Sequence, residues 1–158
     1  MRVVVYVPRS GSRFYASKLA EDLDYEFLGE VFNTRTYPDP IEHNKIIHRA
    51  LTDKNIVCKV DLIMLRRWYS DLEEMFFNNA DQIDVIYRKD FNAQVHSLFT
   101  AMSLDNFHNQ FTETKQMQFN PDTFQMAIDY VNKCNELTAD FLKQNAHKDV
   151  KLVHTESF

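Results

Sequence analysis

The chain has 158 residues, of which 44% are hydrophobic and 26% charged, and its formal net charge is −5. The length suits a single domain over residues 1–158, and the balance of apolar and charged residues excludes disordered, collagen-like and coiled-coil classes. The negative charge argues against a surface devoted to nucleic acid, so we expect a small partner, with no nucleic acid and no membrane.

Two cysteines, Cys58 and Cys134, are too few and too far apart in sequence for a disulfide framework or a zinc site. We interpret them as core thiols in a reducing compartment. The N-terminal apolar run is too short for a signal peptide and no stretch reaches membrane-spanning length, so we expect a cytoplasmic protein. The scarcity of glycine beside abundant Asn, Lys, Asp and Phe is typical of an AT-rich genome, such as that of a phage.

In chain order, runs rich in β-branched residues predict strands, and apolar residues repeated at helical spacing predict helices. The predicted strands cover residues 3–7, 25–28, 55–60, 83–87 and 151–154. The predicted helices cover residues 12–23, 41–51, 65–79, 91–104 and 121–145. The proline-containing stretch 33–40 is predicted to be a loop.

Local signals support several of these elements. Asp90 and Asn120 stand where helix N-caps are expected, and Pro121 falls in the first turn, where its missing N–H is not needed. Leu23 shares a predicted inward stripe with Tyr15 and Leu19 on the first helix. A second stripe is expected to lie in the core, and it comprises Trp68, Tyr69, Leu72, Met75 and Phe76.

Strands that alternate with helices predict an α/β fold with three layers (α/β/α) and a parallel sheet of about five strands joined by right-handed crossovers. In such sheets ligands bind beyond the carboxyl ends of the strands. The stretch "PRSGSR" follows the first predicted strand, and "RKD" follows the fourth.

The first of these stretches has the features of an anion-binding loop. A strand that turns through a short glycine-containing loop into a helix directs backbone N–H groups and the helix dipole at one point. Gly11 allows close approach of the main chain, Ser10 and Ser12 add hydroxyl donors, and Arg9 and Arg13 add cationic forks. The alternative is a tight turn with surface arginines. A complete Walker A pattern is absent, which disfavours a metal-dependent ATPase or GTPase.

At these residues the sequence resembles a known family. "VPRSGS" is similar to the 5′-phosphosulfate-binding loop of the sulfotransferases that use 3′-phosphoadenosine 5′-phosphosulfate (PAPS), which commonly reads P-[RK]-[ST]-G-[ST]-T. The resemblance implies that residues 9–14, from Arg9 to Phe14, cradle the donor, with Arg9 also stabilising the transferring group. Arg13 departs from the family pattern, because it stands where the family usually has threonine.

Two further segments extend the resemblance in the expected order. "LGEVFN" is similar to the GE-x-F segment after the second strand, which implies that Glu30 is the general base for the acceptor. "VIYRKDFNAQVHSLFTA" is similar to the element that holds the donor's 3′-phosphate, which implies roles for Arg88 and Ser97. The register leaves open whether Lys89 takes the place of Arg88. The closing "VKLVHTESF" resembles a strand that in many members ends in YEDL.

The resemblance as a whole implies a short, P-loop nucleotide-kinase-like sulfotransferase core. Its expected reaction is sulfuryl transfer from PAPS as co-substrate, without a metal, to a hydroxyl or amine of a small-molecule or carbohydrate acceptor. Two alternatives stay open: a non-catalytic nucleotide- or phosphate-binding module of the same fold, and a small-molecule kinase. His43 and His48 lie near the 33–40 loop but are expected to be surface histidines. The sequence leaves the oligomeric state open.

Overall fold

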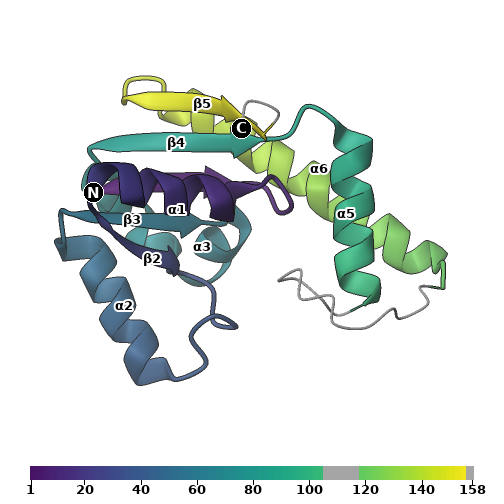
Figure 1. Ribbon diagram of the computed structural model, residues 1–158, viewed down its shortest axis with the longest axis horizontal. Coiled ribbons are helices and arrows are strands. Elements are labelled where there is room, and N and C mark those ends of the chain that lie inside the picture. Colours follow the sequence, from purple (N-terminus) through teal and green to yellow (C-terminus); the bar gives the residue numbers. More distant parts are fainter. Residues whose placement is uncertain (105–117, 156–158) are drawn as a thin grey trace.

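A five-stranded parallel sheet, in the order β2-β3-β1-β4-β5, forms the centre of the molecule (Figure 1). The computed structural model describes residues 1–104 and 118–155. The strands are β1 (Arg2–Tyr6), β2 (Glu26–Glu30), β3 (Ile56–Val60), β4 (Gln82–Tyr87) and β5 (Val150–His154). The helices are α1 (Ser12–Leu23), α2 (Pro40–Thr52), α3 (Leu62–Trp68), α4 (Glu73–Asn78), α5 (Phe91–Ser103) and α6 (Pro121–Gln144), with a 3₁₀ turn η1 (Ser70–Leu72). The predicted α/β class and the parallel sheet of about five strands are confirmed.

The strand order creates a switch point beside β1. The chain passes from β1 to the edge strand β2, returns to β3, and then crosses to β4 on the other side of β1. In register, Val4 lies between Lys59 of β3 and Asp84 of β4. The carboxyl ends of β1, β3 and β4 therefore meet at one edge, which is where ligands bind in sheets of this type.

One face of the sheet is covered by α1. Ala16 and Ala20 are buried against Val4, Val57 and Ile86, so a stripe of small residues lets the helix approach the strands closely. The prediction that Leu23 points inward is wrong, because this residue is one of the exposed large apolar side chains. The alanines, and not the leucine, face the sheet.

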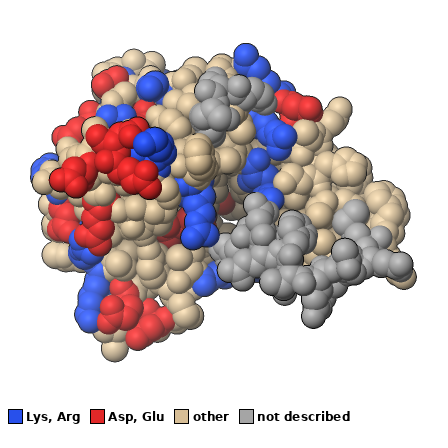
Figure 2. Space-filling model, in the orientation of Figure 1, with Lys and Arg blue, Asp and Glu red and all other residues tan. Residues whose placement is uncertain are grey.

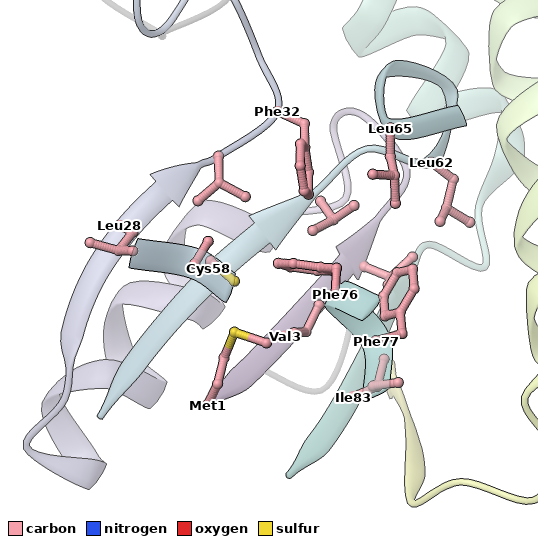
Figure 3. Close-up of a cluster of buried hydrophobic side chains, with 14 of the residues drawn as sticks. Met1, Val3, Leu28, Phe32, Cys58, Leu62, Leu65, Phe76, Phe77 and Ile83 are labelled. Carbon is pink, nitrogen blue, oxygen red and sulfur yellow. The ribbon is translucent and has the colours of Figure 1, made fainter. Parts of the chain in front are cut away.

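The opposite face carries the larger core, in which aliphatic side chains pack around several phenylalanine rings (Figure 3). Phe32 meets Phe76 edge to face at a centroid distance of 5.0 Å, and Phe77 meets Phe141 of α6 at 4.6 Å. Such ring pairs add to the stabilisation that apolar burial provides. This core attaches α4 and α6 to the sheet.

A third cluster joins α5 to α6 and reaches the start of the loop after β1. It contains Val7, Val95, Phe99, Val131 and Cys134. Both cysteines are buried and free, as the sequence predicts. The caps are also confirmed, since Asp90 accepts from the backbone N–H of Ala93 and Asn120 accepts from those of Asp122 and Thr123.

The predicted helix over residues 65–79 is wrong, because the structure divides it. Tyr69, with φ −142° and ψ 33°, ends α3, and the 3₁₀ turn η1 separates it from α4. The break allows the Tyr69 ring to pack on Phe32 at 5.3 Å, while Phe76 and Phe77 are both buried against the sheet. The expected core stripe is accordingly interrupted, and Trp68 and Met75 are exposed. Within the described residues, no helix has the length and apolarity required to cross a bilayer.

This division leads to a prediction about stability. Phe76 is 0% exposed and Trp68 is 59% exposed, although the sequence places both on one apolar stripe. We expect Phe76→Ala to lower the free energy of unfolding by about 3–5 kcal/mol, because it leaves a cavity in the core. Trp68→Ala should lower it by less than about 1 kcal/mol, since that ring only covers the Arg67 guanidinium at the surface. Urea titration of both variants measures the difference, and equal losses would contradict this description of the core.

Candidate anion-binding site

The loop between β1 and α1 has an unusual backbone. Arg9 has φ 64° and Gly11 has φ 72°, so two residues of the loop are left-handed and only one of them is glycine. A left-handed arginine costs about 1–3 kcal/mol, so the surrounding structure must hold it in place. Loops of this kind gather backbone N–H groups into a concave site for anions. Gly11 also occupies the N-cap of α1, where no side chain of the described residues caps the helix.

Two side chains from distant parts of the chain hold this loop. Gln94 of α5 donates from Nε2 to the carbonyl of Pro8 at 2.8 Å. Thr155, just after β5, donates from Oγ1 to the carbonyl of Ser10 at 2.5 Å and also lies 3.2 Å from the carbonyl of Tyr87. Both side chains donate to carbonyl groups of the loop. These bonds therefore do not use the backbone N–H groups of the loop. The last three residues of the stretch that closes the chain lie outside the described residues.

Both serines of the loop are buried. Ser10 is 0% exposed, and among the residues that the structure describes its Oγ has no hydrogen-bond partner. A buried hydroxyl without a partner carries a desolvation penalty of about 1–3 kcal/mol, which a ligand oxygen would relieve. Ser12 is also buried and begins α1. These two hydroxyls fit the predicted role of donors to an anion.

The structure brings Arg9 into contact with Ser97, which is 88 positions later in the sequence. Arg9 Nε donates to Ser97 Oγ at 2.9 Å. Burial, followed by repulsion from Arg88, lowers the pKa of Arg9, so the two guanidinium groups lie close enough to oppose each other. An anion bound beside them would remove this opposition.

Arg88 is partly buried, whereas Lys89 is exposed. On the face seen in Figure 2, Lys and Arg side chains gather beside the hollow between the sheet and α5.

Arg13 and Phe14 are exposed on the first turn of α1. Arg13 lies near enough to Lys59 to contribute to lowering the pKa of that lysine. Arg13 therefore adds positive charge near Lys59.

Glu30 lies at the end of β2 and not in the loop that the sequence predicts, because β2 continues two residues beyond the predicted strand. The pairing register between β2 and β3 shifts between Phe27 and Gly29, and Gly29 has φ 75° at this irregularity. Glu30 Oε1 accepts from Lys59 Nζ at 2.9 Å, and Oε2 accepts from Asn33 Nδ2 at 2.7 Å. The carboxylate is thus held firmly at the same edge as the anion loop.

Sequence reasoning missed three residues of this edge, which are Lys59, Asp61 and Tyr130. Tyr130 of α6 donates to Asp61 Oδ2 at 3.0 Å, and the other oxygen of Asp61 caps α3 through the N–H of Ile63 at 2.8 Å. Burial raises the pKa of Asp61, although these donors oppose the shift. The available signal was a lysine within an apolar strand, because a buried lysine almost always has a partner.

The expectation that His43 is a surface histidine is wrong, while His48 is exposed as expected. The His43 ring nitrogen Nε2 lies 2.8 Å from the carbonyl of Val31, and the ring stacks on Tyr37 at 5.6 Å. The Tyr37 hydroxyl donates to the carbonyl of Leu28. His43 therefore fixes the segment that follows Glu30, and it is a structural residue of this loop.

No family model matches the sequence, and no curated protein matches it. Among solved structures, the chain is similar to shikimate kinase from Bacteroides thetaiotaomicron, with a TM-score of 0.54 and 11% sequence identity. The match covers 98% of this chain and 86% of that chain. At this identity the likeness shows the fold alone, and it agrees with the α/β class and parallel sheet expected from the sequence.

The anchoring of the loop can be tested without a ligand. We expect Thr155→Val to raise hydrogen–deuterium exchange over residues 8–12 several-fold and to lower the free energy of unfolding by about 1 kcal/mol, because the Ser10 carbonyl loses its donor. Thr52→Val is the matched control, since the Thr52 hydroxyl bonds the carbonyl of His48 on the exposed side of α2. Equal exchange of the loop in both variants would show that Thr155 does not hold it.

Proposed function

We propose that this protein is a small sulfotransferase that takes a sulfuryl group from PAPS and passes it to a hydroxyl or amine of a small-molecule or carbohydrate acceptor. The observation that carries the proposal is the bond between Arg9 and Ser97. Arg9 and Ser97 belong to two separate motifs, and the family resemblance implies that both motifs bind the same donor. In the structure the two side chains are in contact.

The charges and donors of the site suit a ligand with two anionic ends. The left-handed loop, with the buried hydroxyls of Ser10 and Ser12, offers donors for a 5′-phosphosulfate. Arg88 and Ser97 offer a cation and a hydroxyl for a 3′-phosphate, and Arg9 bonds to Ser97 and lies near enough to Arg88 to be repelled by it. The unpartnered Ser10 Oγ and the opposed guanidinium groups are the features of this structure that such a ligand would satisfy.

Sulfuryl transfer depends mainly on positioning and on stabilisation of developing charge. The bound donor supplies the sulfuryl group and leaves as 3′,5′-ADP. Arg9 stabilises negative charge on the bridging oxygen as its bond to sulfur breaks, an effect worth about 3 kcal/mol for a preorganised donor. Glu30 receives the proton that the acceptor loses as its new bond to sulfur forms.

A small-molecule kinase is the second candidate, and two observations favour it. The chain has the fold of shikimate kinase, and Asp61 follows β3 directly beside β1, where a carboxylate can approach the phosphate end of the loop. Ser12 stands where a P-loop kinase has its lysine, which weighs against phosphoryl transfer. A non-catalytic binding module of the same fold is the remaining alternative.

Calorimetric titration separates these functions. A sulfotransferase should bind 3′,5′-ADP without a metal more tightly than it binds ATP with Mg²⁺, and a kinase should show the opposite preference. Transfer of labelled sulfate from PAPS to acceptor mixtures then distinguishes the enzyme from a non-catalytic module. Preference for ATP with Mg²⁺ would refute the proposal.

Arg9→Ala should abolish sulfuryl transfer while the fold remains intact by circular dichroism, because the cation at the reacting group is lost. Arg67→Ala, at an exposed position on the last turn of α3, is the control and should retain full transfer. Turnover that survives in the Arg9 variant would remove this residue from the mechanism.

The choice between Arg88 and Lys89 can be made in the same way. Arg88 is the residue whose charge acts on Arg9, so we expect Arg88→Met to weaken binding of 3′,5′-ADP by about 10-fold or more. Lys89→Met should weaken it by less than about 3-fold, because an exposed charge is screened by solvent. The reverse order, measured by calorimetry, would assign the phosphate contact to Lys89.

A further inference from the structure

A buried lysine stands at the centre of the edge that carries Glu30. The Lys59 side chain is 5% exposed, and it reaches its partner from the next-to-last position of β3. Removing a charge from water costs free energy that a single ion pair does not generally recover, so an apolar residue would serve the fold at least as well. The position of this lysine therefore points to a role other than stability.

The geometry of Glu30 is fixed from several directions. Lys59 holds Oε1 and Asn33 holds Oε2, and the Tyr6 hydroxyl lies close enough to the carboxylate to help lower its pKa. The Tyr6 ring lies against the Lys59 ammonium, 4.3 Å from nitrogen to ring centroid, so it fixes the lysine as well. Burial, followed by the charge of Glu30, raises the pKa of Tyr6 well above its ordinary value, so its hydroxyl remains a donor.

We propose that Lys59 is a positioning residue, which with Tyr6 holds the Glu30 carboxylate ionised and in one orientation beside the anion loop. This inference rests on the proposed function, in which Glu30 receives the proton of the acceptor. Its physical content, that Lys59 controls the charge state of Glu30, can be measured without turnover.

The groups around Glu30 define what the lysine must do. The titratable and charged side chains that act on Glu30, or on Lys59 beside it, are Lys59, Tyr6, Tyr37, Asp61, Tyr130 and Arg13. Burial alone would raise the pKa of Glu30, but Lys59, with the Asn33 and Tyr6 hydrogen bonds, lowers it below the ordinary value. Because the folded pKa of Glu30 is depressed, ionisation of this carboxyl contributes stability above the ordinary carboxyl pKa, and that contribution is lost as pH falls through the folded pKa.

The test is a pH titration of the Glu30 side-chain carboxyl by carbon-13 NMR, assigned with Glu30→Gln. In Lys59→Met the carboxylate stays partly buried and loses its cation, so we expect its titration midpoint to rise by about one pH unit or more. Lys59→Arg restores a cation and should return the midpoint toward that of the unmodified protein. The control is Lys45→Met, which removes an exposed lysine paired with Glu42, and the Glu30 midpoint should stay unchanged in this variant.

An unchanged Glu30 midpoint in Lys59→Met would overturn the inference. If this variant fails to fold, Tyr6→Phe provides the measurement, because it removes a hydroxyl that helps to lower the Glu30 pKa and should raise the midpoint by a smaller amount.

Calorimetry with 3′,5′-ADP on the unmodified protein distinguishes this inference from the proposed function. Failure of 3′,5′-ADP to bind, with a Glu30 midpoint that still depends on Lys59, would refute the function and leave the control of Glu30 by Lys59 in place. Binding with an unchanged midpoint would refute the inference alone.

Discussion

Parallel pairing on both sides of β1 is the constraint on which the candidate site depends. Because β3 and β4 run in the same direction as β1, the residues that follow all three strands emerge at one edge. The left-handed loop, Asp61 and Arg88 are thereby brought together from three separate parts of the sequence. The pairing of the strands is sufficient to bring these residues to one edge, and no bond between their side chains is needed.

The sequence was sufficient for the parts of the fold that local physics determines. Apolar runs located every strand, and Asp90 and Asn120 marked two helix starts, because a cap is a contact between near neighbours. The break at Tyr69 was not predictable in this way. It depends on the rings of Phe32 and Phe76, which are brought to it by folding and have no signature in the local pattern.

In the candidate site, too, local features could be predicted from the sequence and long-range contacts could not. The backbone of the loop was predictable in part, since a glycine after a strand favours the left-handed conformation that Gly11 adopts. The partners of the loop were not, because Gln94 and Thr155 are ordinary residues until the fold places them against two carbonyl groups. Lys59 could have been recognised from the sequence. A lysine within an apolar strand is expected to be buried and to pair with a carboxylate, as Lys59 does with Glu30.

Thr155 also bears on the order in which the protein is built. Its bond to the Ser10 carbonyl spans 145 residues, so the loop after β1 receives one of its supports from a residue that is synthesised much later. During translation the central strands can pair while β5 is still inside the ribosome, but the loop does not yet have its full backbone restraint. The loop should thus reach its final conformation only after β5 has joined the sheet, so the geometry of this edge depends on completion of the whole sheet.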